Sequence, residues 1–104
     1  MFKKSKRINS REFTTVFKKG KKSFSSFFQI ITFGEEYKVA VVISKKKIKK
    51  RIQRNREKRR ILHVIKKIVE QYPLSTNMII FIQKDTQNLS FNELEQELLH
   101  SIKK

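Results

Sequence analysis

A dense group of cations occupies the middle of the chain. Eleven of the 16 residues between positions 45 and 60 are Lys or Arg, and Glu57 is the one acid among them. The chain has 19 Lys but only seven Arg, and five of the seven Arg lie between residues 51 and 60. A guanidinium group grips phosphate oxygens in pairs and stacks on bases, which an ammonium group does not. The segment therefore predicts a surface for nucleic acid, on which Asn55 is suited to read a base edge or a 2′-hydroxyl.

The charge of the whole chain favours the same partner. Its 104 residues carry 26 basic and 9 acidic side chains, a formal net charge of +17. Self-repulsion at this level opposes a compact state, and a bound polyanion relieves it. A solvated charged face without a ligand is the plain alternative, but closely packed cations repel one another unless something neutralises them.

A second candidate site combines rings with cations near the N-terminus. Phe13 and Phe17 are one helical turn apart, and lysines follow at positions 18, 19, 21 and 22. This combination suits single-stranded nucleic acid, since bases stack on rings while cations hold phosphates. Because the chain has nine Phe, a simple core role for both rings remains an open alternative.

Signals for catalysis by the protein itself are weak. The chain has no Cys, and neither His63 nor His100 lies in an acid–His–nucleophile pattern. The sequence contains no cluster of metal ligands and no Gly-rich phosphate loop. We therefore expect neither a catalytic residue nor a metal site in this protein.

The sequence also bears on location. No apolar run reaches the roughly 18 residues of a membrane span, and no apolar stretch follows the basic N-terminus as in a secretory signal. We expect a cytoplasmic protein without membrane contact. A membrane-surface helix over residues 53–72 is the rival, but its apolar face lacks Trp and is needed as core.

The first helix is predicted over residues 10–19. Asn9 is its expected N-cap, and Glu12 completes a capping box three residues later. Gly20 is the expected C-cap. Ile8 is placed to pack against Phe13 as a hydrophobic staple.

Three strands and two further helices are predicted after it. Residues 27–33 and 38–44 are expected as strands joined by a hairpin-type loop at 34–37, and residues 78–82 as a third strand. A last helix is predicted to begin after Ser90, with Ser90 and Glu93 forming a second capping box. The rings expected in the core are Phe27, Phe33 and Phe91, and the stripe expected to be buried in the last helix is Phe91, Leu94, Leu98 and Ile102.

The long middle helix is predicted over residues 53–72, with Pro73 ending it. At about 100° per residue, its core face comprises Ile61, Ile65, Ile68 and Tyr72, and its opposite face Arg56, Arg59, Arg60, His63 and Lys67. Arg54 and Lys58 are expected to project past the sheet toward a groove. The element order is therefore α-β-β-α-β-α in one α+β domain spanning 1–104, packed as an antiparallel hairpin joined to a βαβ unit. Five acids against one Lys in residues 68–102 predict that the C-terminal part faces away from the polyanion.

Three motifs in this order resemble the bacterial ribonuclease P protein family, over residues 4 to 102. They are Glu12-Phe13-x-x-Val16-Phe17-x-x-Gly20, the strand from Val39 to Ser44 running into Lys45-Lys46, and the arginine-rich signature Arg54-Asn55-Arg56-x-Lys58-Arg59. The sequence differs from the family pattern in having Glu57 at a usually apolar position, Leu62 at a usual Arg, and the stretch Lys47-Ile48-Lys49-Lys50-Arg51, which is one residue longer than usual.

The resemblance implies a fold and a function. The fold is a small central sheet with helices, like the second domain of ribosomal protein S5, with room for one extra short strand and with a left-handed βαβ crossover. The function is that of the protein subunit of ribonuclease P, in which the RNA subunit uses Mg²⁺ to cut precursor tRNA at its mature 5′ end. The metal is expected to be held mainly by the RNA, and no obligate protein partner is expected.

The resemblance and the residue types together give two sets of site residues. The set predicted to bind the catalytic RNA is Lys45, Lys46, Arg54, Asn55, Arg56, Lys58, Arg59 and Arg60. The set predicted to hold the 5′ leader of precursor tRNA in a cleft is Phe13, Phe17, Lys18 and Ile31. A structural RNA-binding protein, such as a small basic ribosomal protein, remains the alternative, because it shares the charge and the fold class but has no leader cleft.

Overall fold

The computed structural model describes residues 8–72 and 75–103. Three helices and four strands follow one another in the order α1 (Ser10–Lys19), β1 (Lys21–Phe24), β2 (Phe28–Phe33), β3 (Lys38–Val42), α2 (Arg51–Gln71), β4 (Asn77–Ile82) and α3 (Phe91–Lys103). The α+β class and the predicted order are confirmed, and the extra short strand is β1. The predicted stop at Pro73 lies outside the described residues.

The four strands form one mixed sheet in the order β1-β2-β4-β3. β4 pairs antiparallel with β2 and parallel with β3, so the predicted βαβ unit is β3-α2-β4. The predicted hairpin across residues 34–37 is wrong, because β4 lies between β2 and β3. The hairpin is formed instead by β1 and β2. β4 is apolar on both faces, which fits an interior strand. The left-handed sense expected for the crossover stays a prediction.

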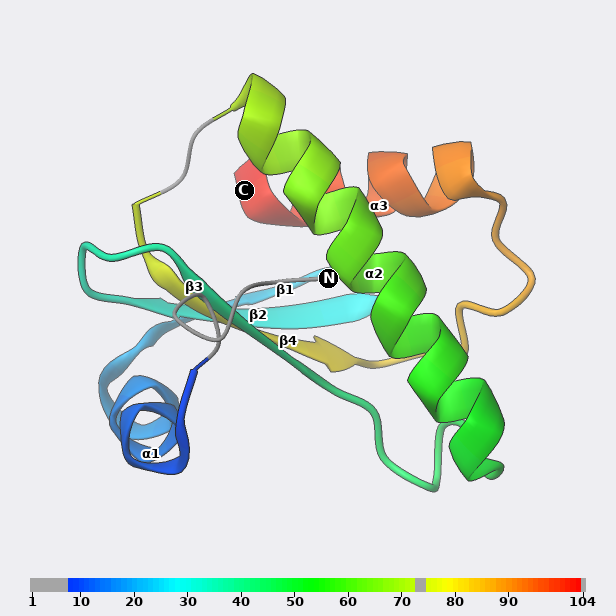
Figure 1. Cartoon of the computed structure of the whole chain (residues 1–104), viewed down its shortest axis with the longest axis horizontal. Coiled ribbons are helices and arrows are strands. Elements are labelled where there is room, and N and C mark those ends of the chain that lie inside the picture. The colour runs from blue at the N-terminus through cyan, green and yellow to red at the C-terminus, as the bar shows by residue number, and fades with distance from the viewer. Residues whose placement is uncertain (1–7, 73–74, 104) are drawn as a thin grey trace.

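The helices divide between the two faces of the sheet (Figure 1). α2 and α3 cover one face, where the buried core includes Phe28, Ile30 and Ile80 from the strands and Ile65 and Leu98 from the helices. We call this the closed face. α1 packs on the other face over a much smaller cluster centred on Val16, Ile31 and Ile79. We call this the open face, because among the described residues one short helix covers only part of it.

Local signals at the helix ends explain how α1 is placed. The capping box is confirmed, with the Glu12 amide donating to the Asn9 side chain at 2.8 Å and the Asn9 amide donating to Glu12 at 3.1 Å. Gly20 caps α1, but in an extended conformation, with φ −71°. Its lack of a side chain is required by close packing, since a Cβ atom there would lie 2.4 Å from Ile31 Cγ2 and 2.4 Å from the Val16 carbonyl oxygen.

The last helix differs from its prediction at one ring. The capping box of Ser90 and Glu93 is confirmed by two hydrogen bonds. Phe91 is not in the core, because 55% of its surface is exposed. Phe33 is also partly exposed, at 37%. The buried residues of α3 are Leu94, Leu98 and Ser101, and Ile102 is partly buried against the same core. The predicted stripe is therefore confirmed at Leu94 and Leu98, holds in part at Ile102 and is wrong at Phe91.

Candidate nucleic-acid interface

A row of four side chains crosses the open face next to α1. Phe24 of β1 lies opposite Gln29 of β2, Gln29 lies opposite Phe81 of β4, and Phe81 lies opposite Val42 of β3. Residues directly opposite one another in a sheet point to the same face. α1 packs over the neighbouring row through Val16, so this row forms a floor beside the helix.

Aromatic rings form a wall at the edge of this floor. The Phe13 and Phe17 rings stack with centroids 6.2 Å apart and planes 14° from parallel. Both rings pack edge to face against the Phe81 ring, with centroid-to-centroid distances of 6.4 Å for Phe13 and 6.0 Å for Phe17. The Lys22 ammonium lies 5.3 Å from the centroid of Phe17, whose surface is 45% exposed. Rings that remain exposed beside a cation are suited to stack unpaired bases.

An ion pair holds the start of α1 to the sheet. The Lys38 ammonium of β3 donates to the Glu12 carboxylate, which also completes the capping box. The hydrogen bond from Lys38 lowers the pKa of Glu12 below its ordinary value, and the same bond raises the pKa of Lys38. Because α1 makes a limited core contact, this pair helps to fix the wall over the floor.

A second cationic surface lies at the head of α2. The lysines of residues 45–50 are exposed, while Ile48 between them is buried and anchors the loop. Arg54 closes the loop from the helix, since its Nη1 donates to the carbonyl oxygens of Ile48 at 3.0 Å and Lys49 at 2.6 Å. The buried Ile and the Arg clamp together hold the lysines in an ordered array at the helix N-terminus, where backbone amides add to the attraction for anions.

Most arginines of this surface stay unneutralised by the protein. Arg51, Asn55, Arg56 and Arg59 are exposed. Within residues 8–72 and 75–103, the ion pairs involve none of these three arginines. The guanidinium groups are therefore available to an external anion.

Arg60 behaves differently from its neighbours. Its Nη1 donates to Glu57 at 2.6 Å, its Nη2 donates to the Leu89 carbonyl, and the guanidinium lies 5.1 Å from the centroid of Phe91. Glu57 is 1% exposed and also accepts a hydrogen bond from the Thr86 hydroxyl. A buried carboxylate requires such partners. These contacts form a clasp that joins α2 to the segment leading into α3.

Comparison with known proteins decides the family. The model of the family described as Ribonuclease P matches residues 2–104. The chain belongs to the ribonuclease P protein family. The predicted resemblance is thereby confirmed, and membership implies a role in tRNA 5′ processing as a protein component of that ribonucleoprotein.

Relatives and solved structures agree with this assignment. The chain is 28% identical over 97 residues to the ribonuclease P protein component of Finegoldia magna, covering 92% of this chain and 86% of the relative. It is 30% identical over 107 residues to that of Bacillus cereus, covering 98% and 92%. A mutant ribonuclease P protein of Staphylococcus aureus has the same fold, with TM-score 0.83 at 22% identity over 96% of this chain and 87% of that one. The protein from Thermotoga maritima gives TM-score 0.78 at 20% identity, with coverage of 90% and 92%.

The structure distinguishes, by their exposure, the four residues that were predicted to hold the leader. Phe13 and Phe17 form the wall, and Lys18 is exposed on α1. Ile31 is fully buried under Val16 and against Gly20, so its side chain is removed from any contact with RNA. Ile31 points to the open face, as the alternation of β2 predicts, but at that position α1 covers it. Its role is therefore to support α1 on the sheet.

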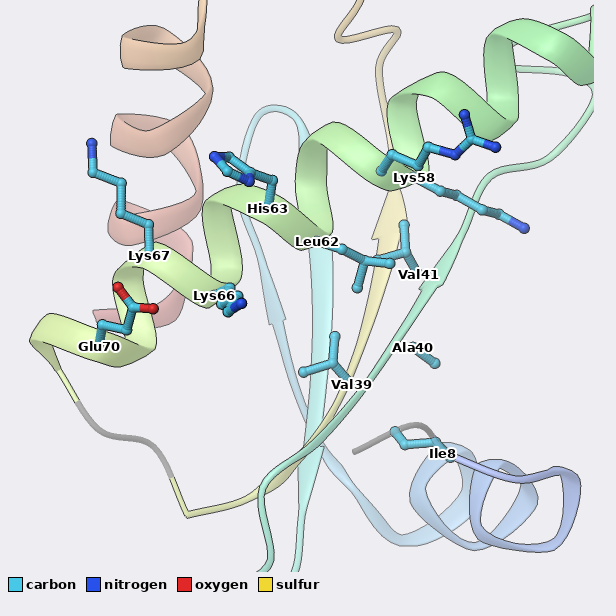
Figure 2. Close-up of a pocket in the computed structure, with 11 residues that line it drawn as sticks. Ile8, Val39, Ala40, Val41, Lys58, Leu62, His63, Lys66, Lys67 and Glu70 are labelled. Carbon is cyan, nitrogen blue, oxygen red and sulfur yellow. The ribbon is translucent and has the colours of Figure 1, made fainter. Parts of the chain in front are cut away.

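The predicted RNA-binding set needs two corrections. Arg60 was placed on the outward face of α2, but it is occupied by Glu57 and Leu89. Arg54 does not line the groove toward which it was predicted to project, because its guanidinium turns back to the carbonyls of Ile48 and Lys49. Lys45, Lys46, Asn55, Arg56 and Arg59 are exposed, and Lys58 lies at the groove beside β3 that was expected for it (Figure 2). The RNA-binding roles themselves stay predictions.

Two rings of the open face were missed from sequence. Phe81 lies in the apolar run 78–82, where it cannot be told from a core residue until the strand order is known. Phe24 lies in β1, which was not predicted with its own bounds, and 58% of its surface is exposed. In the described residues, no group of three His, Cys, Asp or Glu side chains is arranged to hold a metal ion. No helix among those residues has the length and hydropathy of a membrane span.

Proposed function

We propose that this protein binds the RNA subunit of ribonuclease P through the head of α2 and the 45–50 loop, and the 5′ leader of precursor tRNA through the open face. In this role it assists Mg²⁺-dependent endonucleolytic maturation of the tRNA 5′ end. The RNA subunit performs the cleavage and holds most of the Mg²⁺. The protein alone is expected to cleave no RNA.

The observation that carries the proposal is the exposed aromatic wall on an incompletely covered sheet. Phe17 and Phe13 stand over Phe81 with Lys22 beside them. A core would bury all three rings, whereas Phe17 is 45% exposed and Phe13 and Phe81 are half-buried, which leaves ring surface accessible beside cations as a single-strand site requires. The unneutralised arginines of α2 form a separate surface on another element, so one molecule has room for two RNA strands.

Binding of precursor and mature tRNA to the reconstituted holoenzyme tests the leader site. The wild-type holoenzyme should bind precursor more tightly than mature tRNA. Phe17→Ala should reduce this preference about tenfold, since stacking of one base contributes about 1–3 kcal/mol. Phe91→Ala is the matched control, because Phe91 is a similarly exposed ring on the α3 side. Equal affinities for both tRNAs in the wild-type holoenzyme would instead favour a structural RNA-binding protein.

The salt dependence of RNA-subunit binding tests the α2 surface. About six phosphate contacts predict a slope near −5 for log affinity against log salt. The double variant Arg56→Ala/Arg59→Ala should make this slope shallower by about 1–2 units. Lys84→Ala, which removes an exposed cation outside that surface, should leave the slope close to wild type. An unchanged slope in the double variant would mean that these arginines do not meet RNA.

A further inference from the structure

A groove of about 810 Å³ lies between α2 and the outer strand β3 (Figure 2). Val39 and Val41 of β3 and Leu62 of α2 give it an aliphatic floor. Ile8 and Ala40 continue the lining around the strand toward α1. The groove is therefore separate from the aromatic wall and lies further along α2 than the Arg54 clamp.

Cations dominate the helical side of this groove. Lys58, Leu62 and Lys66 are spaced four residues apart, so they share one stripe of α2. Arg59 joins this stripe from the adjacent position. The ion pairs among the described residues leave Lys58, Arg59 and Lys66 unneutralised, whereas Lys67 pairs with Glu95 at 3.5 Å. Glu70 is the one acid in the lining, and it lies at the far end of the helix.

The strand side of the groove adds hydrogen-bonding groups. β3 is at the end of the sheet order, so its pairing with β4 uses one side of its backbone. The amides and carbonyls of its other side face away from every other strand of the described sheet. An outer edge of this kind is a ready template of donors and acceptors for a ligand.

The aliphatic floor, the cationic helical side and the hydrogen-bonding strand side of the groove together indicate which kind of ligand fits it. An aliphatic floor offers no favourable interaction to a bare inorganic anion. A second copy of this chain would bring another net charge of +17 against the cations of the groove, which repel it. An unpaired nucleotide matches all three sides, because it has an apolar base face, a polar base edge and flanking phosphates. Protein recognition of RNA sequence is directed mainly at such splayed bases.

We propose that one unpaired nucleotide of the ribonuclease P RNA subunit docks in this groove, which deepens the proposed function and rests on it. Its base lies on Val39, Val41 and Leu62, and the base edge meets the outer backbone of β3. Its flanking phosphates lie on Lys58, Arg59 and Lys66. The groove thus selects one single-stranded position of the RNA, which Arg51 and Arg56, exposed at the head of α2 outside the groove, do not.

Chemical probing of unpaired bases in the assembled holoenzyme tests the assignment. At saturating protein, the wild type should protect a single-stranded position of the RNA subunit within a larger footprint. Lys66→Glu and Leu62→Gln should each restore the reactivity of that position and weaken RNA binding about tenfold, while the rest of the footprint stays. Lys84→Glu, with the same charge change outside the groove, should keep the protection. Thermal unfolding of each variant verifies that it is folded.

Three results would overturn the proposal in different ways. Protection that persists in both groove variants would remove the groove assignment and leave the proposed function intact. Absence of any footprint with the wild-type protein would remove the proposed function and the groove assignment together. A dimer of the free protein that dissociates in Lys66→Glu, with the RNA footprint unaltered, would assign the groove to a second copy.

Discussion

The two faces of the sheet differ in how completely they are covered. On the closed face, Ile30, Ile80 and Ile82 are at most 4% exposed beneath two helices. On the open face, α1 buries Ile31 and Ile79 but leaves the row containing Phe24 and Phe81 partly uncovered. The comparison indicates that stability is concentrated on one face, so that the other can expose rings and polar groups to a ligand.

Neighbouring residues of β4 give the strongest test of this division. Ile80→Ala removes a fully buried side chain from the closed face and should lower the free energy of unfolding by about 3–4 kcal/mol. Phe81→Ala removes a larger side chain from the open face, where it is half-buried, and should cost only about 1–2 kcal/mol. Urea unfolding measures both values.

The same pair should show the opposite order in binding. Phe81→Ala should reduce the preference of the holoenzyme for precursor over mature tRNA, because the stacked rings of α1 lose their support. Ile80→Ala should leave that preference unaltered under conditions in which the variant is folded. If both variants lost stability and preference in parallel, the two faces would not be functionally separate.

Breaking the clasp between α2 and the segment leading into α3 should have the next largest effect on stability. Glu57→Ala leaves the partly buried Arg60 without its carboxylate and should destabilise the protein by about 3 kcal/mol. The double variant Glu57→Leu/Arg60→Met replaces the ion pair by apolar side chains and should regain most of this loss. Its RNA affinity should equal that of wild type, because Arg60 is occupied within the protein. A double variant with weakened RNA binding would return Arg60 to the RNA-binding set.

Elements governed by neighbours in sequence were predictable from sequence. The capping boxes at Asn9 and Ser90 were assigned correctly because each depends on residues three apart. The strand order was not predictable in this way. Whether residues 34–37 form a hairpin depends on where β4 inserts, and β4 is more than 30 residues away in the chain.

The same distinction separates the site residues. The cationic head of α2 was found from composition, and the rings of α1 from helical spacing. Arg60 was misplaced because its partners include Leu89, which is 29 residues away. Phe81 joined the site only through its register with Gln29 and Val42. Long-range packing therefore decides which residues of a correctly predicted local pattern are exposed at the candidate interface.

The close approach of α1 to the sheet gives a smaller and more specific test. Gly20→Ala places a methyl group against Ile31 and the Val16 carbonyl, and should cost about 1–3 kcal/mol of stability. Because the clash lifts the end of α1, the preference for precursor tRNA should fall as well. Gly34→Ala is the comparison, since its φ of +80° makes any side chain strained. That variant should lose stability without loss of preference.

The smallest expected effect concerns the two acids of the capping boxes. Glu12→Gln keeps the capping geometry and removes the charge that pairs with Lys38. Since the folded protein has a lowered Glu12 pKa, the contribution of this charge is present at neutral pH and is lost as the pH falls through the folded value. The raised pKa of Lys38 means that its part is present below the unfolded value and lost at strongly alkaline pH.

The difference in unfolding midpoint between wild type and Glu12→Gln should therefore be positive at pH 7 and disappear once the pH falls below the lowered Glu12 pKa. Glu93→Gln is the matched variant on α3, because bonds from the Ser90 amide and hydroxyl group lower the pKa of Glu93. The difference in unfolding midpoint between wild type and Glu93→Gln should also decrease as the pH falls. Only Glu12→Gln should in addition weaken the preference for precursor tRNA. An equal loss of preference in both variants would show that α1 and α3 are not independent, and that the open face is set by the whole fold rather than by its one short helix.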